Sequence, residues 1–578
     1  MLTKDNRFIK KQYRKALFPI MFSVLGGTLN TFVDSCFVSQ SLGADAMAAI
    51  NLCMPVFLFL CMFGSMFSNG AASVSAVEIG KERLEGSRKV YFSGLLWCLL
   101  VGAVIMAITP FIIGPLTDFL AKGGTHTQLV RDYVFVTLLG CIPTMIVYMP
   151  IRYLQLDGKP ADISRMMIIM IGTDVALDYL FLFIVHWGMT GAALASVIST
   201  TIATIYGFVI LQKGELYRLS IKALKLYKTM DIIKFGAQPS FGNLWESVKM
   251  FFLNSAVLST LGAPGAAVWA VLNSLSEISM CISQGVPQAA AAMIGVYYPS
   301  RENASIKELM GIQLRWGIAL SAGYGLLIVA LNYPIARLFN VDQELVFPLL
   351  CLALSVVMDT VTTTWVRYMN TVGFYGFAGF LNFIRKLLVP VAIAYNIAYL
   401  GIYFWTFLPV SNLFVMIIGL ATVYLIILRS RRTKHPLTSA LLLDEELERG
   451  NKILDFSIRL TVPEICDAAE RISGFCEIHD MDKKVLFKLS LAIEELMVVF
   501  RNHYNENAVA DMRAFVTEEE TGIQVRIAGD KFDIFEAAEA EDADPTEFMG
   551  VIMMKKLASM TNHYYALGIN TIHIFFER

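Results

Sequence analysis

Charged residues are scarce in this sequence. Asp, Glu, Lys and Arg make up 16% of the 578 residues, whereas hydrophobic residues make up 56%, and the mean hydropathy is +0.58. This composition excludes an ordinary soluble protein and is typical of a chain that crosses a membrane many times. The net charge is −1, so the basic excess that nucleic-acid binding requires is lacking as well, and no nucleic-acid partner is expected.

Paired cysteines are also lacking. The nine cysteines are an odd number, lie mostly inside apolar runs, and include no pair with the spacing of metal ligands. We expect them to be small core residues rather than a disulfide or zinc framework. Separately, no metal site, no cofactor other than a coupling ion and no enzymatic activity are expected. We also expect no cleavable signal peptide, because the basic segment from Lys4 to Lys15 leads directly into an apolar run of spanning length.

Long apolar runs are abundant instead. A transmembrane helix needs about 20 consecutive, mostly apolar residues, and the sequence contains about twelve such segments. They cover residues 16–38, 46–68, 89–113, 130–152, 163–185, 189–211, 235–258, 268–290, 309–331, 346–368, 377–399 and 403–428. The sequence therefore predicts an all-α protein that passes about twelve times through a lipid membrane.

The connectors between these segments alternate in charge. The basic set comprises the N-terminus, Lys81 to Lys89, Arg152 to Arg165, Lys213 to Lys234, Arg301 with Lys307, Arg385 with Lys386, and Arg429 to Lys434. The opposite connectors, near 39–45, 186–188, 259–267 and 400–402, hold almost no Lys or Arg. By the positive-inside rule, we expect both termini on the cytoplasmic side of a bacterial cell membrane.

The two halves of the apolar region repeat each other. Pro19 in the first segment matches Pro239 in the seventh, and Ser41-Leu-Gly-Ala matches Thr260-Leu-Gly-Ala. Internal repeats in a membrane protein of this size are typical of secondary transporters, in which two helical bundles rock about a site near the midplane. We expect two six-helix lobes, residues 1–220 and 221–432.

The composition changes abruptly after Arg432. Residues 433–451 read as a charged linker, and residues 452–578 read as a small cytoplasmic α/β domain. Strands are expected at 455–460, 508–516, 522–527, 562–567 and 571–577, and helices at 463–476, 482–504 and 546–560. About 125 residues are enough to bury a separate core.

Three carboxylates lie inside the apolar segments of the first half. Asp34 has no basic neighbour in its own segment, and Asp174 and Asp178 are four residues apart, so they share one helix face. A charged Asp near a helix centre costs about 2.5–3.5 kcal/mol even on the lenient insertion scale. Such residues either share a proton or bind a cation, and hard oxygen ligands suit sodium or a proton. Helix-end positions for Asp34 and Asp178 remain the alternative.

The second half has acids of its own, Glu246, Glu277 and Asp359. Glu246 and Glu277 are expected either to line a polar cavity that attracts cationic substrates or to hydrogen-bond neighbouring helices. Asp359 lies about two turns from Arg367 on one helix, so a structural Asp–Arg pair is an alternative to a functional role.

In combination, these residues resemble the multidrug and toxic compound extrusion (MATE) family of cation-coupled exporters. The resemblance covers residues 10 to about 430. It is carried by Val33-Asp34, Phe37-Val38, Leu42-Gly43, Gly70 to Ser73, Gly80, Asp178-Tyr-Leu, Gly188 to Ser196, Glu246, Asp359, Arg367 and Gly373.

The resemblance implies a V-shaped pair of six-helix lobes that export organic cations. It also implies an ion-coupling site at Asp34, Asp174, Asp178 and Ser196, with Glu246 and Asp359 matching second-half acids that other members use. Asp174 stands where the family usually has Asn, which leaves both proton and sodium open as the coupling ion.

The C-terminal tail, residues 452–578, resembles the anti-sigma-factor-type branch of the histidine-kinase-like ATPase fold, an α/β sandwich. The resemblance is carried by Ser490 to Glu495, His503-Tyr504, Phe532-Asp533 and Gly550 to Leu557. It implies a degenerate nucleotide site at Glu495, His503 and Gly550. The family's metal-binding Asn falls on Val499. Its adenine-reading Asp and glycine-rich turn fall on residues 527–531, where no Asp stands before Gly529, and its second glycine cluster is reduced to Gly550. We expect a non-catalytic regulatory module whose partner, where it has one, is a cytoplasmic protein.

These observations predict a proton- or sodium-coupled antiporter that exports organic cations or drugs. Two alternatives stay open. A lipid-linked oligosaccharide flippase would favour a basic, Arg-lined cavity, and a membrane sensor that signals through its tail would need an intact nucleotide site.

Overall fold

The computed structural model describes residues 7–42, 44–81, 83–121, 127–214, 216–218, 226–338, 344–429, 440–443, 452–479, 483–516, 520–540 and 547–577. Within these ranges, eight helices are long and apolar enough to cross a membrane, and nine when one bent pair is taken as a single span. The fold is thus a mostly helical membrane protein, as predicted, while the count of about twelve spans stays a prediction. The predicted linker lies outside the described residues except for 440–443.

We call the helices before residue 213 the first lobe. Several are interrupted: a 64° bend separates α4 from the pair α5 and α6, and a π-helical stretch, η1, continues α7. The elements are α1 (Arg7–Leu42), α2 (Ala44–Gly80), α3 (Leu84–Ala121), α4 (Thr127–Leu139), α5 (Cys141–Ile146), α6 (Tyr148–Leu156), α7 (Pro160–Asp178), η1 (Tyr179–Ile184) and α8 (Gly188–Gln212).

The helices from 229 to 429 form the second lobe. Its first helix is interrupted at Gly262, whose φ of 66° is a left-handed conformation that glycine adopts without steric cost. The elements are α9 (Thr229–Ser283), α10 (Gly285–Tyr297), α11 (Asn303–Ala330), α12 (Asn332–Leu338), α13 (Val346–Thr371), α14 (Tyr375–Phe383), η3 (Ile384–Leu388), α15 (Val389–Leu400), η4 (Phe404–Thr406) and α16 (Phe407–Arg429).

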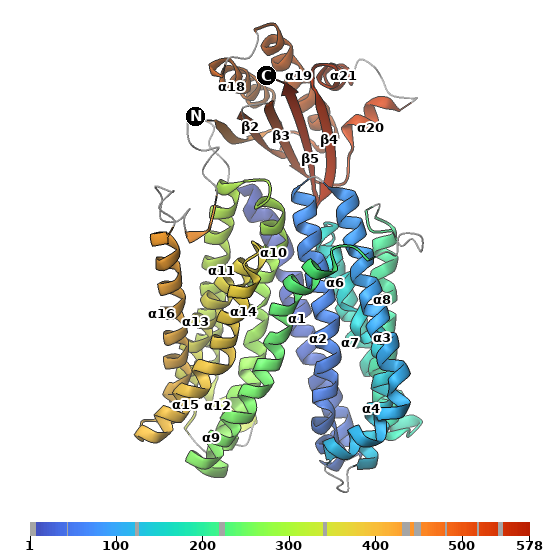
Figure 1. Ribbon diagram of the computed structural model, residues 1–578, viewed down its shortest axis with the longest axis vertical. Helices are drawn as coiled ribbons and strands as arrows, with labels where there is room; N and C mark the ends of the chain where they lie inside the picture. Colours follow the sequence, from blue (N-terminus) through green and yellow to red (C-terminus); the bar gives the residue numbers. More distant parts are fainter. Residues whose placement is uncertain are drawn as a thin grey trace.

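The two lobes converge beneath the C-terminal domain and diverge at the far end, so the helices form a V whose closed end carries that domain (Figure 1). Glycines allow the close approach at the closed end. A Cβ on Gly70 of α2 would lie 1.9 Å from the carbonyl oxygen of Ile232, and one on Gly236 of α9 would lie 1.8 Å from that of Met66. Even a methyl side chain at either position would clash with the opposite backbone, so both positions require glycine and α2 and α9 pack backbone to backbone.

The C-terminal domain, which we call the tail, contains a five-stranded antiparallel sheet in the order β1-β2-β3-β5-β4. The α/β character and the predicted strands are confirmed to within a few residues. Its elements are β1 (Ile453–Arg459), α18 (Val462–Ile478), α19 (Lys483–Tyr504), β2 (Val509–Val516), β3 (Glu520–Ala528), α20 (Ile534–Glu539), α21 (Met549–Leu557), β4 (Met560–Ala566) and β5 (Ile569–Glu577).

The short helix α20 was not predicted from the sequence. Asp533 caps it by accepting hydrogen bonds from the backbone N–H groups of Phe535 and Glu536. Burial acts to raise the pKa of Asp533, but its ion pair with His563 (Nδ1–Oδ2 3.0 Å) and these two bonds together hold that pKa below its usual range. A helix of six residues is too short to show a clear helical periodicity, and one capping carboxylate is a weak signal, so the sequence did not indicate α20.

Candidate functional site

The three carboxylates of the first lobe come from two helices that pack against each other. Asp34 lies on α1, and Asp174 and Asp178 lie on α7 one turn apart. Asp174 and Asp178 are each 1% exposed, and Asp34 interacts electrostatically with both. The structure therefore brings the three predicted residues together in one buried region.

Three polar side chains donate hydrogen bonds to this group. Asn30 Nδ2 donates to Asp174 Oδ2 at 2.6 Å, and Ser199 Oγ donates to Asp174 Oδ1 at 2.8 Å. Ser196 Oγ, predicted from the family resemblance, lies 3.4 Å from Asp34 Oδ2. Asn30 and Ser199 were missed by sequence reasoning. Their spacing is the signal that could have found them, because Asn30 lies one helical turn before Asp34 and Ser199 one turn after Ser196.

Asp178 differs from Asp174 in having no amide or hydroxyl donor. Both of its carboxylate oxygens are buried, and among the described residues no amide or hydroxyl group donates to either of them; its polar neighbour is the carboxyl group of Asp34. It is the last residue of α7, and the π-helical stretch η1 begins immediately after it. Such stretches are frequent at functional sites. A bare buried carboxylate is strongly unfavourable, so Asp178 requires either a proton or a bound cation.

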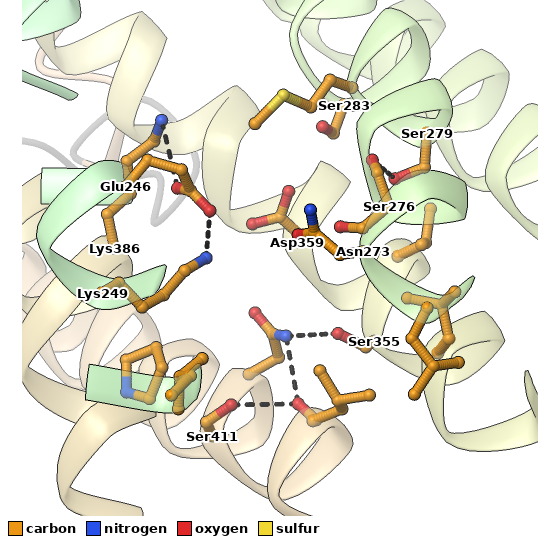
Figure 2. A pocket seen from close by; sticks show the side chains of 18 of the residues that line it. Glu246, Lys249, Asn273, Ser276, Ser279, Ser283, Ser355, Asp359, Lys386 and Ser411 are labelled. Atoms are coloured by element: carbon orange, nitrogen blue, oxygen red, sulfur yellow. Dashed lines mark hydrogen bonds and ion pairs between the residues drawn. The ribbon is translucent and has the colours of Figure 1, made fainter. Parts of the chain in front are cut away.

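A polar pocket lies within the second lobe, between α9, α13, the η3 region and α16 (Figure 2). Its volume is about 110 Å³. Two carboxylates, Glu246 and Asp359, and three cations, Lys249, Arg385 and Lys386, line it. Hydroxyl and amide groups line it as well, from Asn273, Ser276, Ser279, Ser283, Gln284, Ser355, Thr363, Ser411 and Asn412, together with apolar side chains.

Both carboxylates of this pocket already have cationic partners. Glu246 is paired with Lys249, and its other oxygen lies 3.6 Å from the Nζ of Lys386, so it sits between two lysines (Figure 2). Asp359 is paired with Arg385, which also hydrogen-bonds Thr363 and Asn382.

Two expectations about this region were wrong. Arg385 and Lys386 do not belong to a basic connector, because they lie inside the span Tyr375–Leu400 and contribute to the pocket. The arginine that pairs with Asp359 is Arg385 rather than Arg367, whose Nη2 lies 3.4 Å from Gln288 Oε1 instead. Adjacent basic residues usually mark a membrane boundary, but here the burial of two cations is compensated by carboxylates from other helices.

Glu277 does not line the described pocket. It is exposed on α9, and Asn273 Nδ2 lies 3.4 Å from its Oε1, one turn away on the same helix. This hydrogen bond lies within one helix, so it is neither the expected cavity lining nor the expected bond to a neighbouring helix.

The tail residues predicted from the ATPase resemblance take part in packing. Gly550 lies in the first turn of α21, where that helix packs against α19, and Glu495 lies directly opposite. His503 is exposed and stacks on Phe532, with ring centroids 3.8 Å apart. Val499, at the position of the family's metal ligand, is 3% exposed.

Replacing Gly550 with Ala should destabilise the tail. A Cβ there would lie 2.0 Å from the Cβ of Glu495, and overpacking typically costs about 1–3 kcal/mol. Gly474→Ala in α18 is the matched control, since nothing lies within 4 Å of its Cβ, and removing a helix-interior glycine should stabilise by about 0.5–1 kcal/mol. Hydrogen exchange of the tail sheet in the full chain measures both. Equal protection in the two variants would contradict this packing.

Comparisons with known proteins agree with the geometry of the helical region. The MatE family model matches residues 19–180 and 240–404. The multidrug export protein MepA of Staphylococcus haemolyticus is 23% identical over 63% of this chain and 78% of its own length. A probable multidrug resistance protein, NorM of Rhizobium meliloti, is 24% identical over 54% of this chain and 68% of its own length.

Solved structures of similar fold include an outward-facing multidrug resistance MATE family transporter of the MOP superfamily. That structure has a TM-score of 0.68 at 20% identity and covers 75% of this chain and 100% of its own. A crystal structure of MATE in complex with MaL6 has a TM-score of 0.67 at 21% identity, covering 74% and 98%. The family model matches more than half of the residues, and its relatives are transporters and not enzymes; this chain belongs to the MatE family of membrane transporters.

Proposed function

We propose that this chain is an antiporter of the bacterial cytoplasmic membrane, in which entry of a proton or sodium ion through the first lobe drives export of organic cations and drugs. Both termini and the tail lie on the cytoplasmic side in this proposal. The observation that carries it is Asp178, a membrane carboxylate with both oxygens buried and no amide or hydroxyl donor among the described residues, next to Asp34 and Asp174. Multidrug export by the relatives supports the direction of transport.

Coupling requires that the ion and the exported cargo prefer different arrangements of the two lobes. The ion binds at Asp34 and Asp178, beside Asp174, and offsets part of the negative charge of this site. It stabilises one arrangement of the lobes, whereas the cargo stabilises another. Asn30 and Ser199 hold Asp174 through two hydrogen bonds, so Asp178 and Asp34 are the groups free to exchange the ion. An ion bound equally well by both arrangements would drive nothing.

Export of a cationic dye from proteoliposomes of the full chain tests the coupling ion. A pH gradient in sodium-free buffer and a sodium gradient at constant pH are imposed separately. We expect one of them to accelerate export at least about fivefold, which corresponds to a coupling free energy of about 1 kcal/mol. Export that is independent of both gradients would contradict the antiporter.

The tail is proposed to be non-catalytic. Buried Val499 occupies the place of a metal ligand, and Gly550 packs against Glu495 instead of forming part of a flexible phosphate loop. Tight binding of ATP to the full chain would contradict this role and would favour the sensor alternative.

One observation favours the flippase as a second candidate, namely the three cations of the second-lobe pocket. Transport of a lipid-linked oligosaccharide without any response to either ion gradient would support that candidate over the antiporter.

A further inference from the structure

We infer that the second-lobe pocket binds an anionic group of the cargo, a carboxylate or a phosphate. The inference rests on the proposed export function and specifies the class of substrate, because a cargo with a positive group for the acidic first lobe and a negative group for this pocket is amphoteric. Among the described residues, the charged side chains that line the pocket are Lys249, Arg385 and Lys386 on the positive side and Glu246 and Asp359 on the negative side. Glu277 interacts electrostatically with Glu246 but is exposed and lies outside this lining.

The lining of the pocket thus carries one more positive than negative charge. Its cations are largely buried, with side-chain exposures of 19%, 6% and 11% for Lys249, Arg385 and Lys386. An unpaired charge in the membrane interior is costly, and a bound anion removes that cost. An organic cation would instead add a second unpaired positive charge.

Donors are also available for an anion. Lys386 Nζ is 3.6 Å from Glu246, farther than a hydrogen bond. The Nε of Arg385 is buried and has no hydrogen-bond partner among the described residues, although the rest of its guanidinium is held by Asp359, Thr363 and Asn382. Guanidinium and ammonium groups bind carboxylates and phosphates through charge-assisted hydrogen bonds.

The test compares two probes that differ only in the anionic group: 4-(aminomethyl)benzoate, a zwitterion, and its methyl ester, a cation. Dissociation constants are measured by calorimetry on the purified full chain in lipid nanodiscs. We expect the zwitterion to bind about tenfold or more tightly than the ester. Phosphorylated and lipid-linked phosphate probes, used in the same way, distinguish a free anion from a lipid headgroup.

Two variants with opposite expected effects keep the test decisive. Lys386→Met should abolish the preference for the zwitterion, and Glu246→Gln should increase it. Lys89→Met, at an exposed lysine of α3, should leave it unchanged. Equal binding of zwitterion and ester by the unaltered chain, or a preference that survives Lys386→Met, would overturn the inference. Because binding is measured without an ion gradient, failure of the proposed coupling would not produce either result.

A separate set of contacts carries a second proposal, which concerns the tail. Towards the second lobe, Arg526 of β3 forms a buried ion pair with Glu302 at the start of α11 and lies over the ring of Tyr297, 5.1 Å from its centroid. Arg513 of β2 donates to the carbonyl oxygens of Ser300 and Arg301 at 3.0 and 2.9 Å. Both arginines are buried.

Towards the first lobe, the turn between β4 and β5 docks on the connector between α6 and α7. The N–H of Leu567 donates to the carbonyl oxygen of Leu156 at 2.8 Å. Gly158 and Gly568 both have left-handed φ angles and approach so closely that a Cβ on Gly158 would lie 2.2 Å from the nitrogen of Gly568. Tyr564, Ala566 and Ile569 join the same buried cluster as residues of both lobes.

We propose that the tail bridges the two lobes and holds the closed end of the V shut (Figure 1). The closed end can open only when the lobes separate there, and separation breaks one of the two sets of contacts. The tail therefore stabilises the arrangement that opens at the far end, and it restrains transport until these contacts are released.

Distances between spin labels at Lys89 of α3 and Arg315 of α11, in a Cys466→Ser background, measure the separation of the lobes. Glu302→Gln removes the partner of Arg526 on the second lobe and leaves its ion pair with Asp511 inside the tail, and Gly158→Ala removes the close approach on the other lobe. Each should raise the fraction of long distances about fivefold or more and accelerate export. Glu470→Gln, at an exposed tail position, is the control. Unchanged distances in both variants, or a rise in the control, would overturn the proposal.

Discussion

Replacing Asp178 with Asn should abolish ion-driven export while the protein still inserts in the membrane. The two oxygens of Asp178 are buried without amide or hydroxyl donors among the described residues, so a proton or a cation is what makes this carboxylate tolerable. An amide has a similar shape but neither exchanges a proton nor attracts a cation. We expect coupled export of a cationic dye from proteoliposomes to fall about 10- to 100-fold, the range of a typical coupling free energy.

The neighbouring carboxylate provides the matched control. Asp174 already receives hydrogen bonds from Asn30 and Ser199, and the family resemblance places Asn at this position. Asp174→Asn should therefore retain most of the export, whereas Asp34→Asn should behave like the Asp178 variant. Comparable losses at Asp174 and Asp178 would show that the donors around each carboxylate do not determine which of them exchanges the ion.

The second large effect is expected at the contact between the lobes. Gly236→Ala places a Cβ 1.8 Å from the carbonyl oxygen of Met66, and a backbone atom cannot move aside as a flexible side chain can. Overpacking of about 1–3 kcal/mol should act mainly on the arrangement in which α2 and α9 touch, because the clash vanishes when the lobes separate. The closed end should open in roughly a tenfold larger fraction of molecules.

The same spin-label pair on α3 and α11 reports this change. Gly323→Ala in α11 is the control, because nothing lies within 4 Å of its Cβ. If the distances in the Gly236 variant match those in the control, the contact between α2 and α9 does not set the balance between the two arrangements.

The first-lobe site was predictable because its residues are acidic and lie in otherwise apolar segments. A carboxylate in an apolar helix is conspicuous, and Asp174 and Asp178 share one face by their spacing alone. Asn30 and Ser199 were not predictable in the same way, because neutral amides and hydroxyls are common in membrane helices and carry a low penalty. Arg385 was misplaced because a sequence does not show which distant carboxylate compensates a buried cation.

In the tail, too, the secondary structure was predictable from local sequence, whereas the contacts with distant residues were not. Alternating and helical apolar patterns predicted its strands and its longer helices to within a few residues. Its docking on both lobes depends on Gly158 with Gly568 and on Glu302 with Arg526, pairs separated by hundreds of residues. Nothing in the local pattern around any of these residues indicates its partner.

The most direct test of the central claim measures ion uptake and cargo release together, with no ion gradient imposed. Proteoliposomes loaded with a cationic dye and an ion-sensitive reporter are diluted into dye-free buffer at equal pH and sodium. We predict that dye leaving through the protein drives protons or sodium inward, and that Asp178→Asn stops this ion movement. Ion movement of the same size in the Asp178 variant, or dye release with no opposing ion movement in the unaltered chain, would contradict the account.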